Sequence, residues 1–390
     1  TDLLYVDYLP GLLRAALLRD DVLDDLLILR NDKPLYVGNS YVGRIVALDK
    51  GLDAAFVDIG LDNPGFLPLN EIPKTLRAQG LSEGLYLKVV VIREGADGKG
   101  VKLRALNETF KGKKAGLLIA RDPLYDWLMR QPGALEEILV TDAGVAKRIK
   151  GLLVSLGREA NSVRLVADKP DLFERNGIEE ALDALLQVDI PLPSGGSLII
   201  EQGRTLTAID VNKGTMQHNG GAEKLHYELN YEAAIEIARQ LRLRNIAGRI
   251  LVDFTSMKSI ESRKRLQGVF KAELKKDYAG HKLFPLYLSG IQELTRKRAG
   301  FSLQGVLLEP VGLGGLGQVA DPHTLAFSAL RSLWATALSN SQGKPEIFAA
   351  PVILRVLKNS KALDYVQDRI GCSIRLTTGQ LSEEKCLNSE

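Results

Sequence analysis

Two aspartates and an asparagine in the second half of the chain have the residue types and spacing of a cation site. Asp210 and Asn212 are two residues apart, and on an extended backbone such side chains point to the same face and can reach one ligand. Asp253 ends the apolar run Ile250–Val252, where an unpaired buried carboxylate would be costly. Oxygen ligands of this kind favour Mg²⁺ or Mn²⁺ over zinc. In the alternative interpretation, Asp210 starts an Asx-turn and Asp253 caps the next segment.

A second candidate site combines two aromatic side chains with a cation. Phe56, Phe66 and Lys99 fall in residues 35–105, where short strands alternate with turns as in a small β-barrel. The strands predicted there are Leu35–Val37, Ser40–Leu48, Ala54–Ile59, Gly65–Pro68, Tyr86–Arg93 and Val101–Leu103. On a barrel such side chains can stack single-stranded bases, although Phe in a barrel also serves as core.

The formal net charge is only +3, but the charge is unevenly distributed. Residues 1–35 hold seven acids and four bases, whereas residues 236–300 hold fifteen bases and six acids. This basic region includes Arg239, Arg242 and Arg244. It indicates a phosphate-binding surface or, alternatively, the solvated faces of basic helices.

The composition, 45% hydrophobic and 25% charged over 390 residues, is that of a globular protein with several domains. Two cysteines, Cys372 and Cys386, exclude a disulfide scaffold and a zinc site made from the cysteines of one chain. The run Leu12–Leu18 contains Arg14 and precedes two aspartates, which disfavours a signal peptide or a membrane span. We therefore expect a cytoplasmic location and no membrane partner.

Hydrophobic periodicity predicts an α/β order of elements in the rest of the chain. Between residues 106 and 190 the predicted elements are strands Leu117–Ala120 and Ile138–Thr141 and helices Pro123–Met129 and Val145–Leu156. Then follow the hairpin Ser197–Glu201 and Thr205–Asp210, the helix Asn230–Ile246 with Asn230 as its cap, the strand Ile250–Phe254 and the basic helix Ile260–Asp277. The C-terminal part adds a helix near Leu325–Leu338 and strands Pro351–Leu357 and Ser373–Thr377. Gly312–Gly317 matches a dinucleotide-binding pattern, but Asp321–Pro322 interrupts any following helix, so we predict a flexible connector.

Several of these segments together resemble the ribonuclease E/G family of bacterial endoribonucleases. The segments that resemble its inserted OB-fold domain are Val42–Ile45, Ala54–Gly60 and Gly65–Leu69. Those that resemble its catalytic region are Leu192–Gly196, Leu206–Asn212, Ile237–Arg244 and Val252–Phe254. The resemblance extends over most of residues 1–300.

The resemblance implies a Mg²⁺-dependent endoribonuclease that cleaves single-stranded RNA, such as rRNA precursors or mRNA, with Mn²⁺ as an alternative cation. By this resemblance Asp210 and Asp253 match the metal-binding acids, and Asn212 matches the amide that supports them. Phe56, Phe66 and Lys99 match substrate contacts, and the hydrolysis leaves 5′-phosphate and 3′-hydroxyl ends. The competing interpretation is a non-catalytic RNA-binding or ribosome-associated factor with an idle nuclease site.

The family fold implies an α/β multidomain chain. An RNase H-like subdomain made of residues 1–34 and 106–190 would flank an OB-fold barrel at residues 35–105. A DNase I-like catalytic subdomain would follow at residues 191–307, then a linker at 308–322 and a small α/β subdomain at 323–390.

Three departures from the family pattern change what we expect. The C-P-x-C motif that donates a shared zinc is absent from Leu308–Gly314, so we expect no zinc, and any homodimer must form without a zinc link. The loop that binds a 5′-monophosphate is not found before Gly116, and its assisting arginine aligns with Gly280, so we expect weak or absent 5′-end sensing. Ser256 replaces an aspartate near the second metal ligand.

Overall fold

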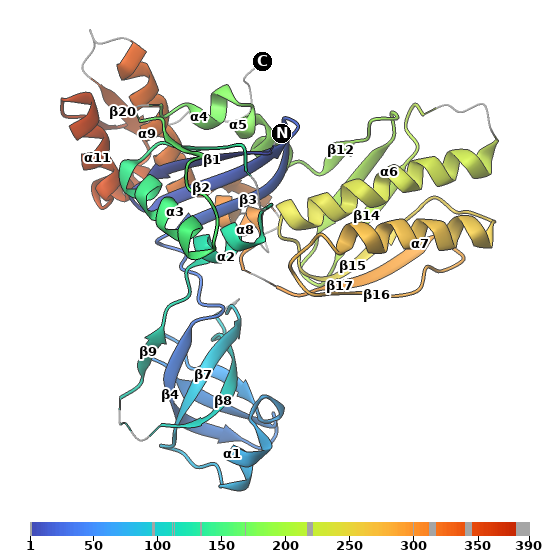
Figure 1. Ribbon diagram of the computed structural model, residues 1–390, viewed down its shortest axis with the longest axis horizontal. Coiled ribbons are helices and arrows are strands. Elements are labelled where there is room, and N and C mark those ends of the chain that lie inside the picture. Colours follow the sequence, from blue (N-terminus) through green and yellow to red (C-terminus); the bar gives the residue numbers. More distant parts are fainter. Residues whose placement is uncertain are drawn as a thin grey trace.

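The computed structural model describes residues 2–95, 98–110, 112, 114–132, 135–167, 169–216, 221–298, 300–311, 317–339 and 345–379. Within these residues the strands form three sheets of five or six strands and two further pairs of strands. Figure 1 shows a β-barrel that projects from a body made of the other two large sheets and their helices. The predicted mixed α/β class is confirmed. The RNase H-like and DNase I-like assignments stay predictions.

The N-terminal sheet joins segments that are far apart in the sequence. Its strands, in spatial order, are β11 (Val163–Leu165), β10 (Glu137–Val140), β1 (Asp2–Leu9), β2 (Leu12–Arg19) and β3 (Val22–Arg30). Helices α2 (Pro123–Arg130) and α3 (Ala143–Ser155) cover one face, and α4 (Leu172–Arg175) and α5 (Ile178–Ala184) cover the other. Because both faces are covered, β2 is buried along almost its whole length, which explains its continuous apolar run.

The OB-like barrel closes through a single bent strand. Its strands are β4 (Ser40–Asp49), β5 (Ala54–Asp58), β6 (Gly65–Pro68), β7 (Tyr86–Arg93) and β8 (Lys102–Thr109), and β9 (Gly116–Ile119) adds to the edge of β4. The first half of β4 pairs with β7 and the second half with β5, so the order β4–β5–β6–β8–β7 returns to β4. At Gly43 a Cβ atom would lie 2.4 Å from Cγ1 of Val57, so only glycine fits between the barrel walls there. The predicted barrel is confirmed, and η1 (Leu69–Glu71) and α1 (Lys74–Ala78) connect β6 to β7.

One predicted barrel strand, Leu35–Val37, is wrong. The backbone N–H groups of Tyr36 and Val37 donate to the carboxylate of Glu94, at 2.7 and 2.8 Å, instead of pairing with another strand. Glu94 is buried, and burial raises the pKa of its carboxyl group even though these two hydrogen bonds oppose the change. A side chain from the end of β7 thus takes the place of a strand partner, which local periodicity does not reveal.

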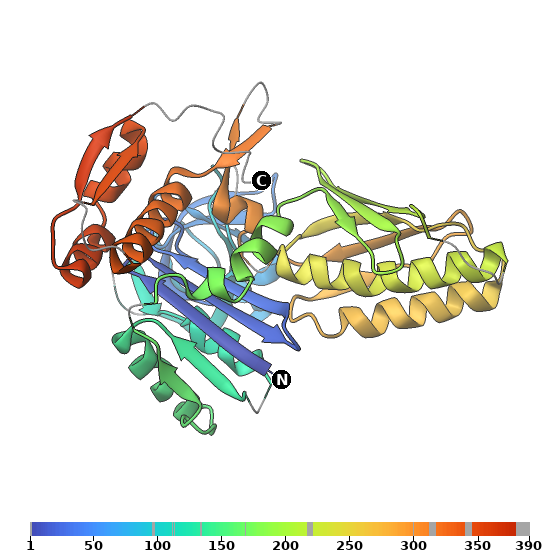
Figure 2. The ribbon, with the colours of Figure 1, turned by 90° about the horizontal axis from the view of Figure 1, so that it is seen from above.

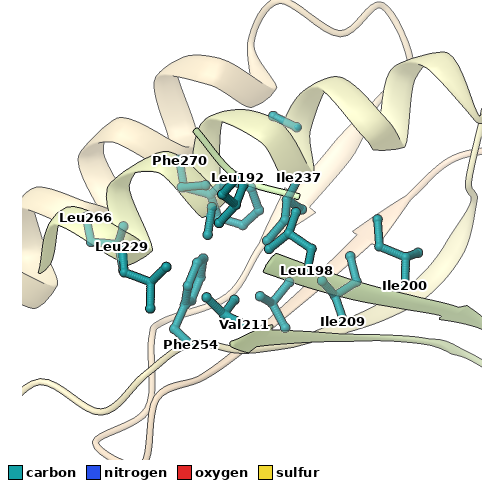
Figure 3. Close-up of a cluster of buried hydrophobic side chains, with 14 of the residues drawn as sticks. Leu192, Leu198, Ile200, Ile209, Val211, Leu229, Ile237, Phe254, Leu266 and Phe270 are labelled. Atoms are coloured by element: carbon teal, nitrogen blue, oxygen red, sulfur yellow. The ribbon is translucent and has the colours of Figure 1, made fainter. Parts of the chain in front are cut away.

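The third large sheet, which we call the aspartate sheet, carries both candidate aspartates. Its spatial order is β12 (Asp189–Pro191), β13 (Ser197–Gln202), β14 (Thr207–Asn212), β15 (Gly248–Asp253), β17 (Ile291–Arg296) and β16 (His281–Leu283). Helices α6 (Ala222–Leu243) and α7 (Ile260–Leu274) both lie on one side of it (Figure 2). Figure 3 shows the strand side chains that point toward these helices and the helix side chains that meet them, namely Leu198, Ile200, Ile209, Val211, Leu229, Ile237, Leu266 and Phe270. The opposite side chains of the same strands are therefore left for another role.

The predicted cap of the long helix is wrong. Helix α6 begins at Ala222, eight residues before Asn230, and Asn230 is fully buried in its interior. The apolar positions predicted for the helix, Ala233, Ala234, Ile237, Ala238 and Leu241, do face the core. The buried polar side chain of Asn230 is tolerated in the helix interior because it forms hydrogen bonds with a neighbouring loop, described below.

The C-terminal part packs against one end of the N-terminal sheet, where Leu9 at the end of β1 and Leu12 at the start of β2 join its core. Its elements are α8 (Leu303–Leu307), β18 (Leu308–Val311), β19 (Gly317–Ala320), α9 (Pro322–Ser339), β20 (Glu346–Ala349), α10 (Pro351–Lys358), α11 (Lys361–Ile370) and β21 (Arg375–Thr378). The predicted strand Pro351–Leu357 is a helix instead, with proline at its first turn and Ile353, Leu354 and Leu357 buried on one face. Most of the predicted connector, 312–316, lies outside the described residues.

In the described part of the chain, no helix combines the length and the apolar composition that crossing a lipid bilayer requires.

Candidate active site

Asp210 and Asp253 are directly opposite each other at the ends of two neighbouring parallel strands. The register of β14 against β15 pairs Thr207 with Ile250 and ends by pairing Asp210 with Asp253. Directly opposite residues on neighbouring strands point to the same face of a sheet. Both aspartates are exposed, whereas their neighbours Ile209 and Val252 are buried under the helices. The two carboxylates therefore share the face that α6 and α7 leave uncovered.

Asn212 forms a hydrogen bond with the carboxylate of Asp210. Its Nδ2 donates a hydrogen bond to Oδ2 of Asp210 over 2.9 Å, which is the i and i+2 relationship expected of an extended strand. One oxygen of Asp210 is thereby oriented, and the other remains available to a ligand. The structure thus brings together all three residues that the sequence singled out for this site.

A hollow of about 290 Å³ lies over the aspartate pair. It is lined by Ile199, Glu201, Ala208, Ile209, Asp210, Leu251, Asp253 and Ile291. Ile199, Asp210, Asp253 and Ile291 form one row across four neighbouring strands, so the carboxylates are flanked by an apolar side chain at each end. A shallow hollow lined by three acids, Glu201 beside the aspartate pair, suits a charged group of an extended polymer rather than an enclosed small molecule.

The donor set at the aspartate pair fits a hard divalent cation. Across the residues that the structure describes, no three His, Cys, Asp or Glu side chains are grouped closely enough to hold a metal ion by themselves. Mg²⁺ commonly binds through one or two carboxylates, keeps several waters and takes further oxygen ligands from a substrate phosphate. Zinc requires three or four protein ligands and prefers nitrogen or sulfur, which this site does not offer.

The loop that follows Asp253 is held by one face of α6. Asn230 donates from Nδ2 to the carbonyl oxygen of Thr255 (2.7 Å) and accepts from the N–H (3.0 Å) and the hydroxyl (2.9 Å) of the same residue. His226 Nδ1 lies 2.7 Å from the carbonyl oxygen of Ser256, so that nitrogen carries the proton and donates it. Glu223 accepts from the backbone N–H groups of Lys258 and Ser259, both over 2.9 Å.

These three α6 side chains were not identified as functional from the sequence. Glu223, His226 and Asn230 are three and four residues apart, which places them on one helix face toward the loop. Their polar types at helix spacing were a usable signal, but their partners are backbone groups that no pattern specifies. The hydrogen bonds from the Ser259 and Lys258 N–H groups hold the pKa of the Glu223 carboxyl group below its ordinary value.

The arginines predicted to bind RNA are engaged inside the protein. Arg239 donates from Nε and Nη2 to the carbonyl oxygen of Leu23, and Arg242 donates to the carbonyl and carboxylate oxygens of Asp24. These contacts connect α6 to the first residues of β3. Arg244 is 1% exposed, and its burial lowers the pKa of its guanidinium group to about 10. The structure does not bring these three side chains to the aspartate pair.

The candidate aromatic residues meet on the barrel wall. Phe56 on β5 and Phe66 on β6 are paired across the strands, with ring centroids 5.9 Å apart and planes at 63°. Both are partly exposed while Val57 and Leu67 beside them face the barrel core, so the rings lie on the outside. Lys99 is exposed in the turn before β8. The barrel and the aspartate sheet are separate units in Figure 1, and the aromatic pair is not part of the aspartate site.

Comparison with known proteins shows the family to which this chain belongs. A family model described as "Ribonuclease E/G family" matches residues 99–299 of the 390-residue chain. The chain belongs to the ribonuclease E/G family. The matched range contains Asp210, Asn212 and Asp253 and leaves out Phe56 and Phe66. The family, and with it the ribonuclease class of enzyme, is confirmed as predicted.

Individual members of the ribonuclease E/G family align with nearly the whole chain. Ribonuclease G of Haemophilus influenzae is 25% identical, with 98% of both chains covered, and ribonuclease G of Escherichia coli K12 is 24% identical, with 96% of both covered. Ribonuclease E of Escherichia coli K12 is 26% identical over 93% of this chain, which spans only 43% of that longer protein. The Haemophilus alignment extends over 479 positions, so that relative contains segments without a counterpart here.

Proposed function

We propose that this chain cleaves single-stranded RNA at internal phosphodiester bonds with the help of a divalent cation, Mg²⁺ in the first instance, held by Asp210 and Asp253. The observation that carries the proposal is the pairing of the two aspartates across β14 and β15 on the uncovered face of the sheet. The family supports a role in RNA processing or decay, which we propose takes place in the cytoplasm. The candidate substrates are rRNA precursors and mRNA.

Each residue of the site has a distinct task in this proposal. Asp210 and Asp253 bind the cation, and Asn212 fixes the orientation of the Asp210 carboxylate through its hydrogen bond. When bound, the cation supplies activation of water and neutralisation of charge on the phosphoryl group. Attack by water on the phosphorus with departure of the 3′ oxygen leaves a 5′-phosphate and a 3′-hydroxyl.

The barrel accounts for the preference for single strands. The outward rings of Phe56 and Phe66 offer π-faces to bases that are not stacked in a duplex, and Lys99 adds a charge for the backbone. The arginines of α6 are left out of the proposed RNA contacts because they bind the N-terminal sheet or are buried.

The experiment that tests the proposal is cleavage of an unstructured RNA in the presence of Mg²⁺ by the wild type and by Asp210→Asn and Asp253→Asn. Both variants are expected to lose cleavage and keep RNA binding and the wild-type melting temperature, since both side chains are exposed. Glu159→Gln, which removes an exposed carboxylate elsewhere, is the matched control. Equal cleavage by wild type and Asp253→Asn would remove the mechanism, and binding without cleavage by the wild type would favour a non-catalytic RNA-binding factor.

The missing loop before Gly116 and the glycine at position 280 lead us to propose that cleavage depends little on the 5′ end. Matched oligonucleotides with 5′-monophosphate and 5′-hydroxyl ends should be cut at similar rates. A many-fold preference for the monophosphate would contradict this part of the proposal.

We also propose that any homodimer forms without zinc, so its mass in solution should not change when a chelator is added.

A further inference from the structure

The uncovered face of the aspartate sheet continues beyond the aspartate pair onto β16, where it carries an aromatic ring and cations. The register of β15 and β16 against β17 shows which side chains share this face. Asp253 pairs with Ile291, Arg249 pairs with Thr295, and Thr295 pairs in turn with Lys282 of β16. Because Thr295 and Ile291 are four residues apart on one strand, Arg249 and Lys282 point to the same face as Asp253.

Phe284 extends this surface past the end of β16. Its N–H donates to the carbonyl oxygen of Glu293 over 3.0 Å, so the backbone continues in register. Phe284 is two positions after Lys282 and therefore points to the same face. The neighbours Leu283 and Leu286 pack against the core below the sheet, whereas Phe284 does not belong to that core. Its carbonyl oxygen accepts hydrogen bonds from Gln267 and Gln292, which hold the backbone in place.

The side chains of Lys282 and Phe284 are in direct contact. The Lys282 ammonium lies 4.5 Å from the centroid of the Phe284 ring, a cation–π geometry, and Lys282 itself is exposed. Arg249 is exposed on the other side of Thr295, 3.7 Å from Glu293. An aromatic face beside cations is the combination that binds a base and its phosphate in single-stranded nucleic acids.

We propose that Phe284 and Lys282 form a nucleotide subsite for the RNA strand that is cut at the cation site of Asp210 and Asp253, with the base stacked on Phe284 and the backbone facing Lys282 and Arg249. This inference rests on the proposed function. Phe284 is two strands away from Asp253 across the sheet and is displaced from it by two residues along the strand direction. These spacings put the two Cα atoms roughly 12 Å apart. The subsite therefore receives a nucleotide that flanks the cut phosphate.

The test uses a set of single-stranded RNAs with one cut position, in each of which a different nucleotide lacks its base. For the wild type, one flanking position is expected to show KM raised by about 5- to 100-fold when its base is removed, the range for loss of one stacked base. In Phe284→Leu this dependence should disappear, since the volume is kept and the π-face is lost, whereas Phe284→Tyr and Phe284→Trp should retain it. Tyr231→Leu, which removes an exposed ring on the helix side of the sheet, should behave as wild type.

The Kd of each of these RNAs is also measured by fluorescence anisotropy without divalent cation. Binding to the subsite is thereby measured independently of cleavage. If the wild type binds with base dependence that Phe284→Leu abolishes but does not cleave, the proposed function fails and the subsite stands. If it cleaves and Phe284→Leu keeps the full base dependence, the subsite is overturned. Should Phe284→Leu fail to fold, Lys282→Gln is expected to reduce the slope of log Kd against log salt by roughly 0.7, and an unchanged slope overturns the subsite.

Discussion

Asn230 in the middle of α6 makes three hydrogen bonds to Thr255, two residues beyond Asp253. Asn230 is fully buried, and its amide satisfies the N–H, the carbonyl and the hydroxyl of that one residue. The turn after β15 is thereby attached to the helix that covers the sheet. We infer that Asn230 is a positioning residue for Asp253.

Asn230→Ala should lower both stability and turnover. The variant leaves the backbone groups of Thr255 without their partner, at a cost to the free energy of unfolding of about 1–3 kcal/mol. The kcat should fall more than KM changes, because the carboxylate of Asp253 loses its support while RNA contacts remain. Denaturant unfolding and steady-state kinetics measure the two effects. Thr255→Val, which removes only the hydroxyl partner, is the matched control and should show a smaller loss of both.

Removing the amide beside the first aspartate should weaken cation binding. Asn212→Ala frees the Asp210 carboxylate from its 2.9 Å hydrogen bond. Loss of such an outer partner typically costs 10- to 100-fold in metal affinity, so we expect the Mg²⁺ concentration for half-maximal cleavage to rise by about that factor. Saturating Mg²⁺ should restore much of the rate. A variant that stays equally inactive at every Mg²⁺ concentration would show that Asn212 acts in another way.

The contribution of Glu223 to stability should disappear in acid. Two backbone hydrogen bonds lower the pKa of this carboxyl group in the folded state below its ordinary value of 4.5. A depressed folded-state pKa stabilises the fold above pH 4.5, and this contribution is lost as the pH falls through the folded-state pKa. The Tm of Glu223→Gln should therefore lie below that of the wild type at pH 7 and approach it below pH 4.5. Glu159→Gln should match the wild type at both values, and a Tm difference for Glu223→Gln that grows in acid would contradict the assignment.

The paired rings of the barrel should contribute to RNA affinity without contributing to the fold. Phe66→Leu keeps an apolar side chain on the outer wall but removes a π-face, so the Kd for single-stranded RNA should rise by about 5- to 100-fold at constant salt. Phe66→Tyr should bind like the wild type. Anisotropy titrations give the Kd, and circular dichroism melting should show little change for either variant. Unchanged affinity of Phe66→Leu would assign these rings to barrel packing.

Replacing Arg244 should change the free energy of unfolding and leave the affinity for RNA unchanged. Its guanidinium is buried and bonds to Gln240, whose own amide also donates to Glu236. Replacing a buried charge by an apolar side chain is often neutral or stabilising, so Arg244→Met is expected to raise the free energy of unfolding by about 1 kcal/mol and leave the RNA Kd unchanged. Arg249→Met, on the uncovered face, should weaken RNA binding instead. Weaker binding by Arg244→Met at equal stability would restore the original assignment of this residue to RNA.

The elements that were predicted well are those with a strong local period. Alternation identified β4 to β7 and β13 to β15 within a few residues, and the 3.6-residue period of Ala233 to Leu241 identified α6. Errors occurred where the apolar run was short. Pro351–Leu357 fits a strand or a helix by composition alone. Leu35–Val37 runs into a turn, and its N–H groups bond to a side chain rather than to a strand.

The sequence by itself determined the family, the barrel and the three residues of the aspartate site, because strand alternation forces Asp210 and Asn212 onto one face and Asp253 ends the next parallel strand. Only the tertiary structure decided which polar side chains serve the site. Arg239, Arg242 and Arg244 are the residue type expected of an RNA-binding surface. In the structure α6 packs against the start of β3, where Arg239 and Arg242 donate to Leu23 and Asp24, and Arg244 is buried. Asn230 is a residue type that often caps helices. In the structure the loop after β15 lies close enough for Thr255 to form hydrogen bonds with its side-chain amide. These outcomes depend on contacts between residues distant in the chain, and local pattern carries no information about them.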